Sequence, residues 1–427
     1  MVRIRLIVVM TLVVFTTNGF CQAPPDLDRW KESGVRTRTA WSWENGLQSD
    51  NQGDPFRLTW GIFQEGATIF TNQPGSDFRT RMNQIYSGGE SEWLPQMESV
   101  FNRWGSISGL EFTYEANDDG GSFFTTSGVL GHRADIRIGG RAIDGNSGVL
   151  AEAWSPNRDI TFDTSDNFFE NISGNSLRLR NVLAHEVGHT LGMAHVLNAT
   201  PSYLMEASYI SAFDGPQLHD IMMAQWGYGD AYEKANNFLG NNDFATAIEA
   251  GIIAPGSGYT IGEDARIDFN ATYAEVFPEE IDFYSIDDET DIDVFHFSLG
   301  ETSSLKITLE ALGFQYMTGP LGGTPTPFNS RARSDLSFEL FDSLENSLAF
   351  VNEQGLQGVE TLALYDLTAG DYFVKIYGAD NPDLTEIDTQ FYSFSIKAVP
   401  EAGSGMACLT IGLLACCRRR RTQLMPS

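Results

Sequence analysis

The string from residue 185 to residue 195 contains three of the six histidines of the chain: His-Glu-Val-Gly-His-Thr-Leu-Gly-Met-Ala-His. His185 and His189 are four residues apart, so on a helix they share one face and can bind the same metal ion. Gly192 can turn the chain out of the helix without a Cβ penalty, which brings His195 round as a third ligand. Three neutral imidazoles leave one zinc coordination position open for water, as in catalytic sites. Glu186, beside the first ligand, is then the candidate general base.

Acidic residues outnumber basic ones by 57 to 27, which gives a formal net charge of −30 at pH 7. A surface of this sign repels nucleic acid and anionic membranes, and it favours calcium. A length of 427 residues with 42% hydrophobic residues predicts two or three domains with sizeable cores. All four cysteines lie in the terminal segments, so we expect no disulfide in the mature protein: Cys21, Cys408, Cys416 and Cys417.

Residues 1–22 have the pattern of a secretory signal peptide. Arg3 and Arg5 precede an apolar run from Leu6 to Phe15, and a polar stretch follows. The run is too short for a transmembrane helix. We therefore expect the protein to be exported.

The C-terminal segment, residues 399–427, has three parts. Val399-Pro400-Glu401-Ala402 and a Gly/Ser spacer precede an apolar run from Met406 to Cys417, and four arginines follow. This end resembles the PEP-CTERM sorting signal of Gram-negative bacteria, although Ala402 stands where that signal has a second proline. The resemblance implies transient membrane association, removal of the tail by an exosortase-type enzyme, and a secreted or cell-surface location that includes the extracellular matrix. A permanent C-terminal membrane anchor is the alternative.

Residues 23–55 are polar and irregular and are interpreted as an N-terminal extension. In residues 56–230, apolar alternation predicts strands and 3.6-residue periodicity predicts helices. The expected strands are Phe56–Ile62, Leu110–Tyr114, Ala134–Ile138, Gly148–Trp154 and Ile160–Phe162. The expected helices are Glu92–Trp104, Leu177–Leu191 and Gln217–Trp226, the second of them entered through a segment in which Asn175 or a serine can cap it.

Residues 57–229 resemble the metzincins and, within that clan, the matrixins. The eleven-residue string carries most of the resemblance. Tyr203-Leu204-Met205 matches the Met-turn, and further matches are Asp220-Ile221 with Gln225, Tyr228-Gly229, Ala134-Asp135-Ile136, and Asp144-Gly145 with Gly148–Ala151. The resemblance implies an α+β catalytic domain, with a twisted mixed sheet plus helices and zinc on the central helix.

The same resemblance implies roles for residues outside the string. Met205 would form the floor of the zinc site, and Tyr209 the wall of the S1′ pocket. Substrate would extend along the edge strand and contact Leu150 and Ala151. Three aspartates fall at matching calcium-ligand positions, although turn residues in solvent are an equally good reading of them: Asp144, Asp163 and Asp166.

Several family features are missing from this chain. Glu152 and Thr161 stand where matrixins have histidines for a structural zinc, so we expect that zinc to be absent. The pro-peptide cysteine switch is also missing. Ala207 replaces a proline of the S1′ wall, and Val196 replaces a serine. His132, His219 and His296 have no metal-ligand spacing and are interpreted as ordinary surface or core histidines.

Residues 235–398 contain many short β-like runs separated by turns, which predicts an all-β sandwich. The runs are Val294–Leu299, Ser304–Leu309, Leu336–Phe341, Ser347–Asn352, Thr361–Leu364, Tyr372–Tyr377 and Phe391–Lys397. This region resembles the bacterial pre-peptidase C-terminal (PPC) domain at Asp291–Phe297, Ser334–Asp342 and Leu367–Ile376. Nine acidic residues between 275 and 293 fit either calcium binding or a solvated acidic face.

The expected function is that of a secreted zinc endopeptidase acting on protein or peptide substrates. Glu186 would activate the zinc water, and calcium would be a second, structural cofactor. The alternative is a catalytically inert surface binding or adhesion protein in which the sandwich dominates. Another metzincin family is a third reading, but Val196 after the third histidine is neither the glutamate nor the aspartate of the astacin or adamalysin types.

Overall fold

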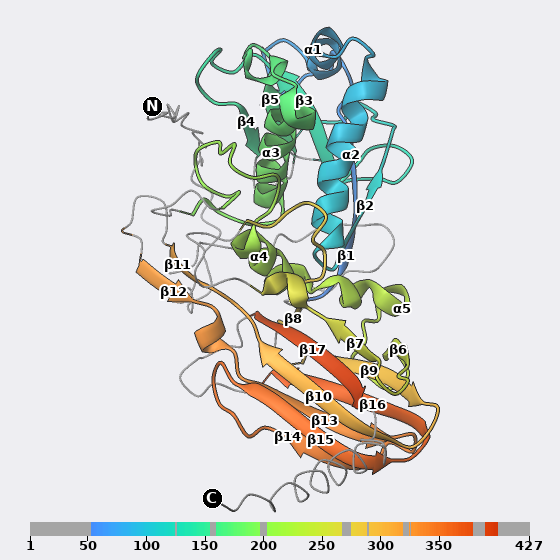
Figure 1. Ribbon diagram of the computed structural model, residues 1–427. Helices are drawn as coiled ribbons and strands as arrows, with labels where there is room; N and C mark the ends of the chain where they lie inside the picture. The colour runs from blue at the N-terminus through green and yellow to red at the C-terminus, as the bar shows by residue number, and fades with distance from the viewer. Residues whose placement is uncertain are drawn as a thin grey trace, which may run out of the picture.

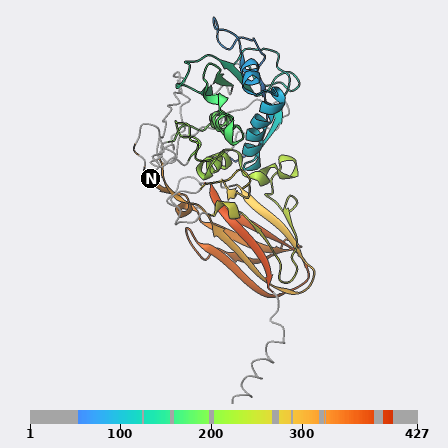
Figure 2. The same ribbon diagram turned by 45° about the horizontal axis from the view of Figure 1, so that its top comes forward.

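The computed structural model describes residues 53–399, apart from 124–125, 154–158, 197–202, 267–274, 288–289, 319–323, 325 and 379–388. Two parts lie end to end: a mixed sheet with helices, and below it a pair of β-sheets (Figures 1 and 2). The expected signal peptide, N-terminal extension up to residue 52, and sorting tail lie outside the described residues. No helix among the described residues is long and apolar enough to cross a membrane.

The first sheet has the strand order β2-β1-β3-β5-β4. Its strands are β1 (Phe56–Ile62), β2 (Leu110–Tyr114), β3 (Ile136–Arg141), β4 (Ala151–Ala153) and β5 (Ile160–Asp163). All neighbours are parallel except β4, which runs antiparallel to β5 and forms one edge. This is the twisted mixed sheet that the matrixin resemblance implies.

Five helices of the described residues accompany this sheet. They are α1 (Phe78–Ile85), α2 (Glu90–Ser106), α3 (Ser173–Thr190), α4 (Leu218–Tyr228) and the short α5 (Ala235–Phe238). Of these, α1, α2 and α3 contact its strands. Short 3₁₀ turns are η1 (Phe168–Glu170), η2 (Ala231–Lys234), η3 (Glu263–Ala265) and η4 (Arg331–Arg333). In α2, Trp93, Met97 and Trp104 are fully buried, which is the apolar face expected from their spacing.

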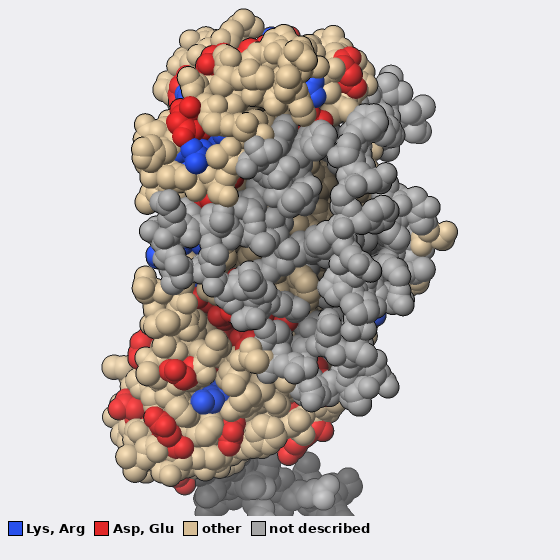
Figure 3. All heavy atoms as spheres, turned by 180° about the vertical axis from the view of Figure 1, so that it is seen from behind, with Lys and Arg blue, Asp and Glu red and all other residues tan. Residues whose placement is uncertain are grey.

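Two five-stranded sheets enclose the second core and form the expected sandwich. Their strands are β6 (Ile248–Ile252), β7 (Gly258–Ile261), β8 (Tyr284–Ile286), β9 (Ile292–Leu299), β10 (Ser303–Ala311), β13 (Leu336–Asp342), β14 (Ser347–Val351), β15 (Val359–Leu367), β16 (Gly370–Gly378) and β17 (Gln390–Val399). One sheet has the order β15-β10-β17-β7 with β8 also paired to β17, and the other β14-β13-β16-β9-β6. A separate hairpin joins β11 (Gln315–Thr318) to β12 (Thr326–Asn329). On the face shown in Figure 3, acidic side chains are numerous over the sandwich and basic ones are few.

The core of the first part also contains residues of the second half of the chain. Seven buried residues beyond position 235 pack into it: Ala265, Val276, Phe283, Leu312, Phe314, Phe328 and Phe391. They come from η3, from the segment before β8, from the β11–β12 hairpin with the turn that leads into it, and from β17. The two parts are consecutive in sequence, but the hydrophobic core is continuous across their junction.

The start of α3 differs from the expected capped helix. The residue preceding the helix is Ile172, and no side chain caps the first turn. Gly174, Asn175 and Ser176 have positive φ values of 64°, 54° and 60°, the left-handed region that asparagine and glycine tolerate best. Regular right-handed helix therefore begins at Leu177, where the sequence pattern placed it.

Candidate metal centre and active site

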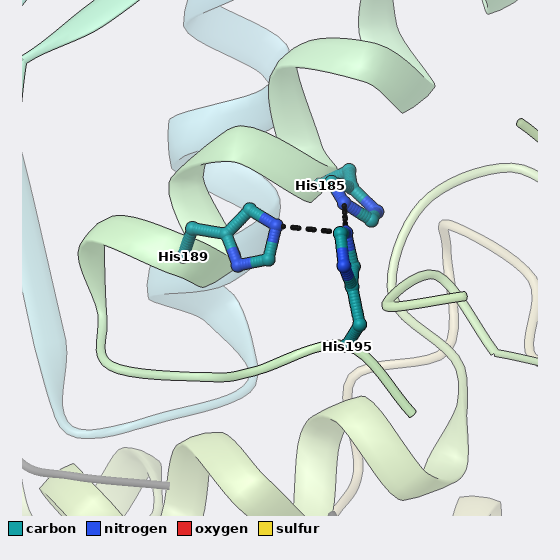
Figure 4. Close-up of side chains that lie close together, drawn as sticks. All are labelled: His185, His189 and His195. Atoms are coloured by element: carbon teal, nitrogen blue, oxygen red, sulfur yellow. Dashed lines mark hydrogen bonds between the residues drawn. The ribbon is translucent and has the colours of Figure 1, made fainter. Parts of the chain in front are cut away.

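Helix α3 carries two of the three histidines and the glutamate. His185, Glu186 and His189 are all on its last turns, and His185 and His189 point the same way (Figure 4). The chain leaves the helix at Gly192, whose φ of 96° is in the region that favours glycine. His195 then returns toward the helix, as the spacing predicted.

The three imidazoles converge through their Nε2 atoms. His195 Nε2 lies 3.1 Å from His185 Nε2 and 3.1 Å from His189 Nε2. The opposite nitrogens face main-chain carbonyls: His185 Nδ1 is 2.7 Å from Leu204 O, and His189 Nδ1 is 2.8 Å from Met193 O. The Nδ1 atoms of His185 and His189 therefore carry the protons, and the Nε2 lone pairs of both rings face the shared centre.

A cation fits this centre better than any set of hydrogen bonds among the rings. Two converging Nε2 lone pairs repel one another unless a positive charge lies between them. Zinc at 2.0–2.1 Å from each nitrogen would place tetrahedral ligands about 3.3 Å apart, close to the separations found here. The residues present therefore fit zinc.

Burial keeps the rings neutral. It lowers the pKa of His189 to about 4 and that of His195 to about 3, while that of His185 falls well below its usual value. Mutual repulsion of the rings lowers the values of His185 and His195 further. Neutral imidazole is the form that binds metal.

Glu186 is fully buried next to the first histidine. Burial raises the pKa of its carboxyl to about 8, and the nearby charge of Glu152 adds to the rise. No described residue makes a hydrogen bond of normal geometry to its carboxylate oxygens. The group is thus positioned to interact with water or substrate, as a general base requires.

Met205 packs directly beneath the helix. A Cβ on Gly188 would lie 2.4 Å from Met205 Sδ, so the absence of a side chain at Gly188 leaves the room that the methionine fills. Val196 N donates to Met205 O at 3.0 Å, which ties the turn to the segment that carries His195. Met205 thus lies against the histidine helix, where the matrixin resemblance places the Met-turn methionine.

The carboxylate of Asp220 binds the backbone of the Met-turn. Its carboxylate accepts the N–H groups of Leu204 at 2.8 Å and Met205 at 3.2 Å. Burial raises its pKa to about 6, and these backbone donors oppose the rise. The sequence comparison noted Asp220 only as a family match; its position in the first turn of a helix was the available signal for a carboxylate that binds backbone N–H groups.

A small, mainly apolar pocket lies beside His185 and Glu186. Of the residues expected to contact substrate, Leu150 and Tyr209 line this pocket, while Ala151 is fully buried in β4 and is not among the lining residues. The other lining residues are Asn181, Val182, Leu204, Ser208, Ile210 and Phe213. Asn181 was missed, although it lies four residues before His185 and so shares its helix face.

The three aspartates expected to bind calcium accept backbone N–H groups instead of converging. Asp163 accepts from Ile143, Asp144 and Gly145, and Asp166 accepts from Ser147 and Phe168. Asp144 accepts from Val149. Among the described residues, these carboxylates are not one of the groups whose ligand atoms lie within 4.8 Å of one another.

Glu152 and Thr161 face each other across β4 and β5. Glu152 forms an ion pair of 2.9 Å with Arg141, and both side chains are largely buried. Neither residue belongs to a metal-binding group of the described part of the chain. Glu152, at one of the positions where matrixins have a histidine, therefore takes part in a salt bridge.

A second group of acidic side chains lies where the two parts meet. Glu233, Asp291 and Asp293 have carboxylate oxygens within 4.8 Å of one another. Asn241 is fully buried beside them; its Nδ2 donates to Asp293 Oδ1 at 2.6 Å, and its Oδ1 has no hydrogen-bond partner among the described residues. This group includes two of the nine acidic residues of segment 275–293, and it is buried rather than solvated.

The remaining histidines are elsewhere. His132 is exposed, His219 is buried and stacks on Tyr203, and His296 pairs with Glu249. None of the three belongs to a metal-binding group of the described residues. They are surface and core histidines, as expected.

Comparisons with known proteins agree with the geometry of the first part. The family model described as matrixin matches residues 81–228. Mouse (Mus musculus) stromelysin-1 is 31% identical over 127 residues, which cover 29% of this chain and 24% of its own length. Metalloendoproteinase 2-MMP of Arabidopsis thaliana is 30% identical over 143 residues, covering 30% of this chain and 36% of that protein. The hatching enzyme of Paracentrotus lividus is 37% identical over 109 residues, covering 23% and 16%.

Residues 81–228 of the chain are thus similar to matrixins. The matches span between 16% and 36% of the length of these three relatives. Among solved structures, the pre-peptidase C-terminal domain of a Bacillus anthracis collagenase is 13% identical, with a TM-score of 0.19; the match covers 35% of this chain and 96% of that domain. That score is too low to assign the fold of the second part.

Proposed function

We propose that the protein is an exported zinc endopeptidase that hydrolyses peptide bonds in extracellular proteins. His185, His189 and His195 would hold the zinc, which supplies Lewis-acid chemistry by acidifying water and polarising a carbonyl. Glu186 accepts the proton of the attacking water and later delivers it to the leaving amine, a role worth about 10²–10⁴-fold in rate. The observation that carries the proposal is the convergence of three Nε2 lone pairs beside one buried carboxyl group.

The neighbourhood of these residues supports a peptide substrate. The pocket beside His185 and Glu186 is lined mainly by apolar side chains, which suits an aliphatic side chain next to the scissile bond. Strand β4 lies at the sheet edge, where an extended peptide can add by main-chain hydrogen bonds. Leu150, immediately before β4, lines the pocket and so connects the two features.

The test compares wild type with Glu186→Ala on a denatured protein substrate, with zinc content measured for both. We expect the variant to retain zinc and to lose cleavage by at least about 10²-fold. A wild-type protein that binds zinc yet cleaves no faster than Glu186→Ala would refute the proposal. That outcome favours the alternative, an inert surface binding or adhesion protein.

Calcium is proposed as a structural ion at the junction of the two parts. The carboxylates of Glu233, Asp291 and Asp293, with the buried amide oxygen of Asn241, form an oxygen-rich set of the kind that calcium binds. Burying several like charges together is costly without a cation. The aspartates Asp144, Asp163 and Asp166 remain a second, separate candidate for calcium.

Export and sorting of the protein are further proposals, supported by the two terminal sequences alone. The signal peptide would end near residue 22, and an exosortase-type enzyme would remove the tail that begins near Val399. Mass spectrometry of the protein recovered from the producing bacterium tests both cuts. An intact tail in the mature protein would favour a permanent membrane anchor.

A further inference from the structure

Residues 276–285, which lead into and include the start of β8, form a strap that lies along α4. Two glutamines of the first part bind the strap's backbone or side chains. Gln217 Oε1 accepts from Val276 N at 2.9 Å, and Gln217 Nε2 donates to Val276 O at 3.2 Å. Gln225 Nε2 donates to Phe283 O at 2.9 Å, and Gln225 Oε1 accepts from Ser285 Oγ at 2.7 Å. Both glutamines are fully buried, so these bonds are shielded from water.

Only one of the two glutamines leads on to the zinc site. Gln217 N donates to Asp220 Oδ2 at 2.9 Å, and the same oxygen accepts from Leu204 N at 2.8 Å. Leu204 O in turn accepts from His185 Nδ1 at 2.7 Å. A continuous chain of hydrogen bonds therefore runs from the strap to a zinc ligand. Gln225 bonds instead to Ile107 O at 3.0 Å, beyond the end of α2.

We propose that Gln217 is a positioning residue through which the second part of the protein sets the zinc site. The strap fixes the Gln217 side chain, and Gln217 and the Met-turn share one carboxylate, that of Asp220. The carbonyl of Leu204 then fixes the tautomer and the orientation of His185. Partners of this kind, beyond the metal ligands themselves, tune metal affinity, and buried networks transmit the loss of one member to the others.

The chain of bonds matters because the strap lies where the two parts of the protein meet. Figure 1 shows α4 between the metal helix α3 and the sandwich strands β8 and β17. A second contact joins the two parts nearby, since Tyr203 Oη lies 3.5 Å from Met317 O of the β11–β12 hairpin, and Tyr203 directly precedes Leu204. The second part of the chain thus reaches the Met-turn from two directions. Its attachment contributes to metal binding as well as to folding.

The inference rests on the proposed zinc function, and its test uses the full chain with two matched variants. Gln217→Met and Gln225→Met each remove two bonds to the strap from a buried position on or next to α4. The measurements are the zinc dissociation constant by chelator competition and the visible absorption spectrum of the cobalt-substituted protein. We expect Gln217→Met to weaken zinc binding by about 10-fold and to shift the cobalt bands. Gln225→Met should lower the melting temperature to a similar degree while its zinc affinity stays within about twofold of wild type.

A variant on the other side of the contact separates the strap from the local bonds of Gln217. Val276→Pro removes the N–H that Gln217 accepts and leaves the Gln217 bonds to Gly215 O and Pro216 O in place. It should weaken zinc binding in the same direction, and it carries the test if Gln217→Met does not fold. Equal zinc affinity in the Gln217 and Gln225 variants, or an unchanged affinity in Val276→Pro, overturns the inference. A wild type that binds zinc but cleaves no protein overturns the peptidase proposal alone, whereas one that binds no zinc overturns both.

Discussion

At the scale of single residues, the three histidines of the proposed zinc site are held neutral by their surroundings. The pKa values of about 4 for His189 and about 3 for His195 mean that these rings carry no extra proton at neutral pH. The carboxyl of Glu186, with a pKa of about 8, holds its proton there. The nearby positive charge of a bound zinc favours the ionised carboxylate. The proton released on metal binding should therefore come from the glutamate and not from the ligands.

This gives a pH-dependent prediction for calorimetry. At pH 7 a carboxyl group of pKa about 8 is mostly protonated, so zinc binding should release most of a proton from Glu186, in addition to any proton lost by the zinc-bound water. The Glu186 contribution should fall as the pH rises through 8 to 9, because the metal-free group is then already ionised. Titrations in buffers of different ionisation enthalpy measure the release. Glu186→Gln is the control and should release less than wild type at pH 7; release unchanged in that variant would place the proton elsewhere.

At the scale of secondary-structure elements, the close approach of α3 to the Met-turn depends on the absence of a side chain at Gly188. A Cβ at Gly188 would lie 2.4 Å from Met205 Sδ, far inside van der Waals contact. The buried Met205 side chain, the helix or the turn would have to move, and the helix and the turn carry or support the candidate zinc ligands. Gly227, in the neighbouring helix α4, has no atom within 4 Å of a Cβ built on it.

Gly188→Ala should therefore destabilise the protein by about 1–3 kcal/mol and weaken zinc binding. Gly227→Ala, in open space within a helix, should be neutral or stabilising by up to about 1 kcal/mol. Urea denaturation with and without zinc measures both variants. Equal stability of the two would contradict the packing described for Met205.

Local sequence patterns predict individual helices and strands only where the pattern is long enough, as the elements of this fold show. β1 and β2 have the bounds expected from sequence, Phe56–Ile62 and Leu110–Tyr114, since alternation and turn residues mark them within a few positions. Helix α1 was missed because only Phe78 and Met82 of its eight residues are buried, too few for a periodic signal. The hairpin of β11 and β12 was missed because its strands are four residues each.

The candidate site divides in the same way. The candidate zinc ligands and Glu186 could be predicted from the sequence because one helix and the turn that follows it carry all of them. The pairing of Gln217 with Val276, 59 residues away, leaves no trace in sequence, since a buried glutamine amide can bind any backbone segment that passes it. The ion pair of Arg141 with Glu152 could likewise not be predicted. The sequence showed only that Glu152 and Thr161 stand where matrixins have histidines.

At the scale of the whole molecule, the continuous core makes the first part dependent on the second. Phe283, Phe314 and Phe391 are buried against residues of the first part. Burying a phenylalanine side chain contributes about 1.5–3 kcal/mol. A chain that ends at residue 234 would lose all of these contacts and expose the surface of α4.

Truncation at Lys234 should therefore yield an aggregating or largely unfolded product. A fragment of residues 235–399 keeps every buried residue of the second core, losing only Tyr232 from its partly buried surroundings, and should remain folded. The intact protein should unfold in one cooperative transition when followed by circular dichroism and by tryptophan fluorescence. A stable, zinc-binding fragment of residues 53–234 would contradict the shared core.

The junction also contains the proposed calcium site, which predicts a specific effect of the ion. Calcium should raise the melting temperature of wild type, because it binds the folded state only. Asp291→Asn should abolish that increase, whereas Asp144→Asn should leave it in place. Differential scanning calorimetry with EGTA or calcium distinguishes the two candidates. Loss of the increase in Asp144→Asn alone would assign the calcium effect to the loop of Asp144, Asp163 and Asp166.

The continuous core has a consequence for how such a protein can be inherited or re-engineered. A catalytic unit whose interior is completed by a foreign segment cannot be exchanged between proteins as a free cassette. Recombination near residue 235 would separate the aromatic residues that fill the gap from the helices that need them. Any successful graft would have to carry the strap, the β11–β12 hairpin and the contacting end of β17 along with the eleven-residue string.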